Sequence, residues 1–137
     1  MDTRELIRQA LVARKASWSP YSNFMVGAAL LAKNGKIYQG CNIENAAYTP
    51  SNCAERTAFF KAVSEGERAF SAIAIVGGQK DSDPLGYAYP CGVCRQVMME
   101  FCQPQSFQVI VASSEDNFTV HTLQQLLPEG FGPENLA

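Results

Sequence analysis

Hydrophobic residues recur along the first third of the chain at spacings typical of helices and of strands. Residues 3–17 place leucine, isoleucine and alanine at helical intervals with charged residues between them, which predicts an amphipathic helix. Residues 25–31 and 37–41 are largely apolar, and the Asn34-Gly35 pair between them is the strongest short-range signal for a hairpin. We therefore expect one helix followed by two antiparallel strands.

Helical and strand patterns alternate through the middle of the chain. Residues 52–65 place three alanines on one face, small enough for close approach to a sheet, and Gly66 ends this predicted helix. The continuous apolar runs at residues 70–76 and 107–112 are typical of strands covered on both faces. Both runs are therefore predicted to be buried strands.

Two further helices and a strand complete the pattern. Apolar residues at helical spacing over 93–101 predict a helix that Pro104 prevents from continuing. Residues 118–121 predict a last strand, which leads into a helix start with capping-box spacing at Thr122 and Gln125. The order α-β-β-α-β-α-β-β-α predicts an α/β fold, a three-layer α-β-α sandwich around a mixed sheet of about five strands.

Length, charge and cysteine content exclude several classes of protein. The 137 residues fit one domain, residues 1–137, and a net charge of −2 leaves no basic stripe for DNA or RNA, so a small substrate is expected. No stretch approaches the roughly 20 apolar residues that span a bilayer. Five cysteines, an odd number, and an N-terminus without a signal-peptide pattern predict a cytoplasmic protein with reduced thiols.

Three of the cysteines lie in two segments that together suit a metal ion. Cys53 opens Cys-Ala-Glu-Arg, and Cys91 and Cys94 form Pro-Cys-x-x-Cys, each at a predicted helix start, where the helix dipole favours thiolates. Three sulfur ligands leave the fourth position of a tetrahedral zinc ion open for water, as a catalytic site requires. A redox pair at Cys91 and Cys94 is the alternative, which the third cysteine and the flanking proline disfavour. Cys41 and Cys102 are interpreted as small core residues.

Glu55 has two interpretations. With Asn52 as helix N-cap, Glu55 three positions later would form a near capping box without any role in catalysis. On the first helical turn, two residues after Cys53, Glu55 also faces the same opening as the fourth metal position. A glutamate that accompanies the metal ligands without binding the ion is the general acid/base of zinc deaminases, and we favour this catalytic interpretation.

The same segments carry a resemblance to a known family. Besides the two cysteine segments, it involves Phe24, Asn42-Ile43-Glu44-Asn45, Ser51 to Thr57 and Cys94-Arg95-Gln96-Val97, in order over most of the chain. The chain resembles the short, homotetrameric cytidine deaminases with three zinc-binding cysteines. The resemblance implies one zinc ion per chain and hydrolytic deamination of cytidine and deoxycytidine to uridine and deoxyuridine plus ammonia, a reaction of pyrimidine salvage.

Asn42 and Glu44 can also be interpreted from their spacing. In an extended segment alternate residues share a face, and an amide beside a carboxylate suits a sugar hydroxyl, which can donate to one and accept from the other. Two solvated loop residues would show the same spacing. It is the resemblance that favours ribose binding by this pair.

The resemblance implies roles for other residues as well. Phe24 would pack against the pyrimidine ring. Arg56 would hydrogen-bond a ligand sulfur and reduce its electron donation, with Arg95 as a weaker candidate for the same task. Further implied contacts with substrate come from the backbone at Ala54 and Pro90, which would bind the base edge, and from Ala46, Tyr48 and Phe131, which would reach the ligand of a neighbouring subunit.

Two other functions stay open at this point. A deaminase of a cytosine-nucleoside antibiotic such as blasticidin S has a similar cysteine pattern, but residues 42–45 favour a nucleoside. A non-catalytic protein that binds zinc or nucleosides would have no need of Glu55 together with the predicted nucleoside contacts. His121, the single histidine, is expected to be structural, and residues 79–89 are expected only to hold Pro90 in place.

Overall fold

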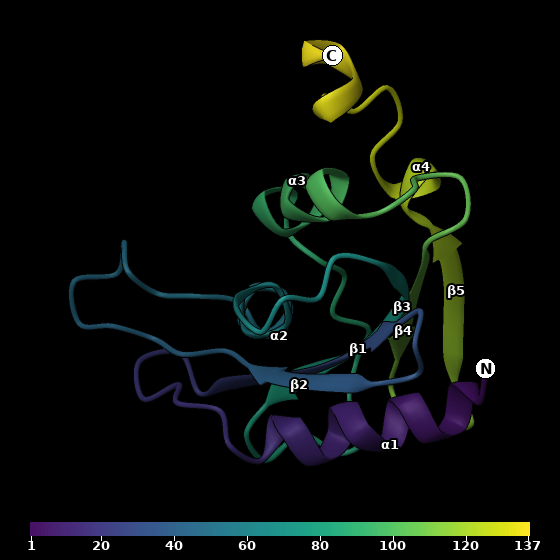
Figure 1. The fold of residues 1–137 in the computed structure, drawn as a ribbon. Coiled ribbons are helices and arrows are strands. Elements are labelled where there is room, and N and C mark those ends of the chain that lie inside the picture. The colour runs from purple at the N-terminus through teal and green to yellow at the C-terminus, as the bar shows by residue number, and fades with distance from the viewer.

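Five strands form one mixed sheet in the computed structural model, which describes residues 1–137 (Figure 1). The strand order is β2-β1-β3-β4-β5, with β3 and β4 parallel and the other neighbours antiparallel. Along the chain the elements are α1 (Thr3–Arg14), β1 (Phe24–Ala32), β2 (Ile37–Cys41), α2 (Ala54–Ser64), β3 (Phe70–Gln79), α3 (Gly92–Phe101), β4 (Gln108–Ala112), β5 (Phe118–Thr122), α4 (Leu123–Leu126) and a 3-10 helix (Pro133–Leu136).

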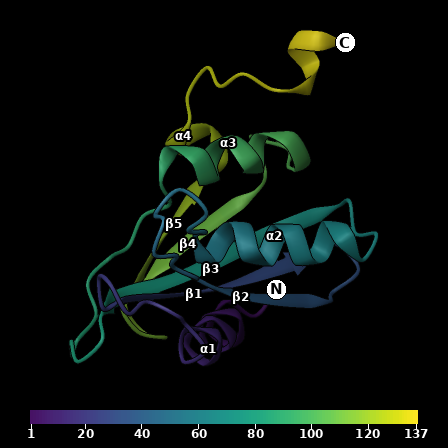
Figure 2. The same ribbon diagram turned by 90° about the vertical axis from the view of Figure 1, so that its left-hand side faces the viewer.

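Helices cover both faces of the sheet. Helix α1 lies on one face, and α2 and α3 lie on the other (Figures 1 and 2). A cluster of 17 buried residues fills the α2 and α3 side, and a cluster of 9 fills the α1 side. The predicted three-layer sandwich with a five-stranded mixed sheet is confirmed. None of its helices is both long and apolar enough to cross a bilayer.

The hairpin between β1 and β2 turns at the Asn-Gly pair. Leu31 pairs with Ile37, and Gly35 takes a φ of +93°, which glycine adopts without steric cost. The Asn34 side chain accepts a hydrogen bond of 2.9 Å from the Lys36 N–H and closes the turn. The local sequence signal was therefore sufficient for this element.

Helix α1 ends at Arg14, three residues before the expected end. The segment that follows makes contacts with a distant part of the chain. The Trp18 N–H donates to the Asn42 carbonyl, and Trp18 forms an isolated parallel β-bridge with Ile43. Arg14 itself donates to the carbonyl groups of Met25, Gly78 and Gln79 at 2.9–3.0 Å, which ties the end of α1 to β1 and β3. Pairing across the chain thus overrides helical continuation.

Helix α2 approaches β2 closely at Gly40. A Cβ atom at this position would lie 2.4 Å from the Ala54 carbonyl oxygen and 2.5 Å from the Ala58 nitrogen. Ala54, Ala58 and Ala62 are all fully buried, as the alanine face predicted. The approach fixes the N-terminal end of α2, which carries the cysteine and glutamate of the first predicted segment.

Candidate active site

The three predicted metal-ligating cysteines converge at the N-terminal ends of α2 and α3. Cys53 and Cys91 are the N-cap residues of these helices, and Cys94 lies in the first turn of α3. The Sγ atoms of Cys53 and Cys91 are 3.8 Å apart, those of Cys91 and Cys94 are 3.6 Å apart, and all three lie within 4.8 Å of one another. Sulfur atoms at about 2.3 Å from a tetrahedral zinc ion lie about 3.8 Å apart, so the cluster fits this ion.

The surroundings of Cys53 favour its thiolate. Hydrogen bonds from Cys94 and then Arg56 lower the pKa of the Cys53 thiol to about 5, against the opposing effect of burial. The Arg56 Nη2 atom lies 3.2 Å from the Cys53 sulfur. The neighbouring Cys53 thiolate favours the protonated form of Cys94 and raises its pKa, and a divalent ion held by the three cysteines would favour the thiolate instead.

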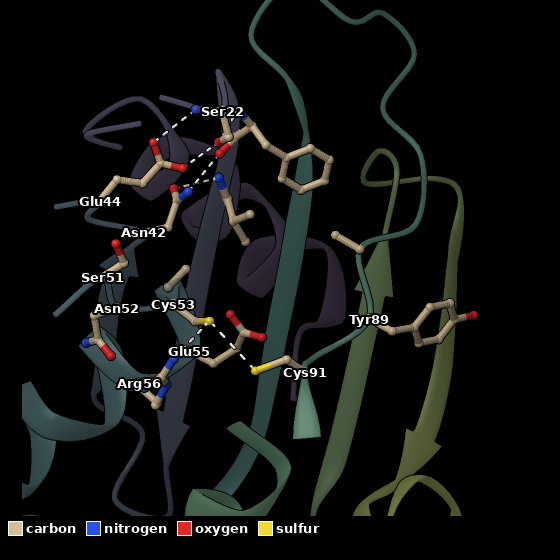
Figure 3. A pocket seen from close by; sticks show the side chains of 14 residues that line it. Ser22, Asn42, Glu44, Ser51, Asn52, Cys53, Glu55, Arg56, Tyr89 and Cys91 are labelled. Atoms are coloured by element: carbon tan, nitrogen blue, oxygen red, sulfur yellow. Dashed lines mark hydrogen bonds between the residues drawn. The ribbon is translucent and has the colours of Figure 1, made fainter. Parts of the chain in front are cut away.

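Glu55 is buried beside the sulfur atoms (Figure 3). Its exposed fraction is 4%, and this burial raises the pKa of its carboxyl group to about 7. The capping-box alternative is wrong: the N-cap is Cys53, and the Asn52 amide donates to the Thr57 hydroxyl at 3.3 Å. Glu55 therefore has no capping partner, and it lines the same cavity as Cys53 and Cys91.

A cavity of about 400 Å³ opens above this cluster. Figure 3 shows Glu44 and Asn42 on the wall facing Glu55 and Cys91, so polar groups line both ends of the space. Its lining residues are Ser22, Phe24, Val26, Asn42, Glu44, Ser51, Asn52, Cys53, Ala54, Glu55, Arg56, Ala88, Tyr89 and Cys91.

Asn42 and Glu44 lie in a segment that is paired on both sides. Ile43 bridges Trp18 and Asn52, and the Glu44 N–H donates to the Trp18 carbonyl at 2.7 Å. The Asn42 amide donates to the Phe24 carbonyl at 2.7 Å and accepts from the Val26 N–H at 2.9 Å. One N–H of this amide has no further partner within the chain, so it can donate to a ligand.

The comparisons with known proteins identify the family. The zinc-binding region of the cytidine and deoxycytidylate deaminases matches residues 1–111, which include the three cysteines and Glu55. The chain belongs to this family. Zinc is accordingly the ion that the Cys53, Cys91 and Cys94 cluster is built to bind, and the enzyme class is a hydrolytic deaminase.

Relatives within this deaminase family match along nearly the whole chain. The cytidine deaminase of Sporosarcina psychrophila is 50% identical over 137 residues, covering 100% of this chain and 96% of its own. That of Halalkalibacterium halodurans is 47% identical over 136 residues, covering 99% and 98%. The crystal structure of cytidine deaminase from Burkholderia pseudomallei is 44% identical, with a TM-score of 0.86, and covers 96% of this chain and 100% of its own.

Arg95 lies away from the sulfur atoms, contrary to its expected place in the deaminase site. Its guanidinium donates to the Pro90 carbonyl at 2.7 Å and to the Leu126 carbonyl at 2.6 Å. These contacts tie the start of α3 to α4 and engage the Pro90 carbonyl that was expected to bind the base edge. Arg56 alone of the two arginines hydrogen-bonds a ligand sulfur.

The residues expected to contact a neighbouring subunit's ligand lie outside the cavity of their own chain. Tyr48 is 73% exposed and packs edge-on against Tyr21. Phe131 is 57% exposed, and its carbonyl accepts a hydrogen bond from Gln96. Ala46 is exposed in the loop before Tyr48.

Several lining residues of the deaminase cavity were missed from the sequence. Ala88 and Tyr89 reach it because the loop after β3 folds back onto the strand, where a Cβ on Gly77 would lie 2.8 Å from that of Ala88. The Tyr89 ring points toward β5 and packs on His121, with ring centroids 5.8 Å apart (Figure 3). The Gly77-Gly78 pair was the available signal for this close approach. Ser22 carried no signal.

Proposed function

We propose that this chain catalyses the hydrolytic deamination of cytidine and deoxycytidine to uridine and deoxyuridine with release of ammonia, in pyrimidine salvage. The observation that carries the proposal is the buried Glu55 carboxyl group in the cavity lined by Cys53 and Cys91, two of the three cysteines whose sulfur atoms lie at zinc-site spacing. Relatives named cytidine deaminase at 47–50% identity support the same substrate.

The chemistry divides between the metal ion and the side chains around it. When bound, zinc acts as a Lewis acid that makes a water molecule nucleophilic near neutral pH. The Glu55 carboxylate accepts a proton from the water that adds to C4 of the cytosine ring and delivers it to ring N3. The same carboxyl group then carries a proton to the departing amine, so that water and cytidine become uridine and ammonia.

The cavity wall orients the nucleoside. Phe24 packs against the pyrimidine ring, and its polar edge is bound by backbone groups at Ala54 and by the lone pair of the Pro90 carbonyl that Arg95 leaves free. Asn42 donates its free amide N–H to a sugar hydroxyl, and Glu44 accepts a hydrogen bond from one. Glu44 is well suited to accept because it is ionised: the Ser22 hydroxyl, and then backbone N–H groups, hold its pKa below the ordinary value.

The proposed assembly is a homotetramer of single-domain chains with sites shared between subunits. The exposed Phe131 and Tyr48 rings and the exposed Ala46 support it, because none of the three lines the candidate active-site cavity of its own chain. We also propose a cytoplasmic location, since zinc binding by three cysteines needs reduced thiols.

Replacing Glu55 by glutamine tests the catalytic proposal. Glutamine keeps the shape of the side chain but cannot carry a proton, so ammonia release from cytidine should fall about 10²- to 10⁴-fold. Zinc content should remain one ion per chain. Glu65→Gln, which alters an exposed carboxylate at the opposite end of α2, should leave the rate unchanged. A zinc-loaded Glu55→Gln protein with near wild-type turnover would refute the role of Glu55.

The wild-type protein tests the substrate. Zinc stoichiometry measured together with ammonia release from cytidine should give one ion and steady turnover. Ultraviolet absorbance assays with blasticidin S run beside those with cytidine should show preference for the nucleoside. Bound zinc without ammonia release, or a strong preference for the antibiotic, would contradict the proposal.

A further inference from the structure

The Ser22 hydroxyl joins two parts of the cavity wall that have separate proposed tasks. It donates a hydrogen bond to Oε2 of Glu44 and accepts one of 3.0 Å from the Phe24 N–H (Figure 3). Ser22 also lines the cavity itself. One small side chain therefore links the carboxylate proposed for the sugar to the strand that carries the aromatic ring proposed for the base.

The loop that carries Ser22 is held by its own backbone contacts. Asn23 has a φ of +58°, a left-handed conformation that asparagine tolerates better than most residues. The Asn23 N–H donates to the Ser19 carbonyl at 2.9 Å, and the Asn23 carbonyl accepts from the Lys80 N–H at 2.8 Å. The position of the Ser22 hydroxyl is thus set by the fold before any ligand enters.

The two carboxylate oxygens of Glu44 are held in different ways. Oε1 accepts backbone N–H groups of Tyr21 at 3.0 Å and Ser22 at 3.2 Å. Oε2 has only the Ser22 hydroxyl as a partner within the chain, which leaves it a lone pair for a ligand. Fixing one oxygen still lets a carboxylate pivot, and the bond to the second oxygen sets its plane.

We propose that Ser22 is a positioning residue that aims the Glu44 carboxylate at a sugar hydroxyl of the bound nucleoside. This inference rests on the proposed function, in which Glu44 contacts the sugar. Its effect on binding depends on that hydroxyl, because a ligand without sugar hydroxyls gains nothing from an aimed carboxylate. A role confined to the fold of the loop, or to Phe24, would affect both kinds of ligand equally.

The test compares two ligands on the zinc-loaded protein. Titration calorimetry with uridine and with 2′,3′-dideoxyuridine gives dissociation constants for the wild type, Ser22→Ala and Ser22→Thr. We expect Ser22→Ala to weaken uridine binding about 5- to 10-fold, as for loss of a hydrogen bond to a charged group, and to leave dideoxyuridine within about twofold. Ser22→Thr, which keeps the hydroxyl, should restore most of the uridine affinity.

Ser64→Ala provides the matched control. Its hydroxyl donates to the Lys61 carbonyl at the far end of α2, so neither ligand should be affected. An equal loss for both ligands in Ser22→Ala, or no loss for uridine, overturns the proposal. Ammonia release from cytidine by the wild type is measured in parallel, so that failure of the proposed function is seen separately from failure of the Ser22 inference.

Discussion

At the scale of single residues, Arg56 provides positive charge to a metal site that is negative. Three thiolates and one Zn²⁺ sum to −1, which makes bound water less acidic than at sites with neutral ligands. The Arg56 Nη2 atom lies 3.2 Å from the Cys53 sulfur, and this bond draws electron density from the ligand. We expect Arg56→Gln to lower kcat/KM for cytidine about 10- to 100-fold in an absorbance assay.

Arg68→Gln is the control for this change. The Arg68 guanidinium donates to the carbonyl groups of Val63, in the last turn of α2, and of Glu67, just beyond it, so its loss should leave turnover unchanged. Full activity in Arg56→Gln, or the same loss in both variants, would show that the contact with sulfur does not matter for the reaction.

At the scale of elements, the contact between α2 and β2 determines where Glu55 lies. A Cβ on Gly40 would collide with helix backbone at 2.4–2.5 Å, and backbone cannot move aside as a flexible side chain can. We expect Gly40→Ala to reduce the free energy of unfolding by about 1–3 kcal/mol in urea titrations. Because the displaced helix end carries Cys53 and Glu55, zinc content and turnover should fall as well.

Gly86→Ala controls for the chemistry of the substitution. Gly86 lies in the loop after β3, and no atom lies within 4 Å of the place that an added methyl group would take, so stability should change by less than about 0.5 kcal/mol. If Gly40→Ala were as stable as Gly86→Ala, the close approach would not be what holds α2 on the sheet.

At the scale of the whole molecule, the C-terminal segment lies beyond α3, where the Gln96 side chain donates to the Phe131 carbonyl, and exposes apolar side chains (Figure 1). Light scattering should give about 60 kDa, four times the 15.0 kDa chain. Phe131→Ala should keep this mass but raise KM for cytidine several-fold, because in the proposed tetramer the ring would reach a neighbour's cavity. Leu136→Ala, also in the exposed tail, should leave KM unchanged. A fully active monomer would remove Phe131, Ala46 and Tyr48 from the site.

The sequence by itself determined the element order, the hairpin and the chemical groups of the metal centre. These features depend on local properties: the hydrophobic period, the Asn34-Gly35 turn and the cysteine spacing. Each of them acts over a few residues and does not depend on the rest of the chain. Local patterns do not show which distant residues meet. That Cys53 lies close to Cys91 and Cys94 could therefore be inferred only from a known combination of motifs.

Only the tertiary structure decided which side chains meet. Arg95 turns to the carbonyl groups of Pro90 and Leu126 rather than to sulfur, and α1 stops at Arg14 because the following segment pairs with residues 42–44. Ser22 reaches Glu44 across 22 positions of sequence. Side-chain direction and long-range hydrogen bonding depend on how the elements pack, and packing is a property of the whole chain that no local spacing encodes.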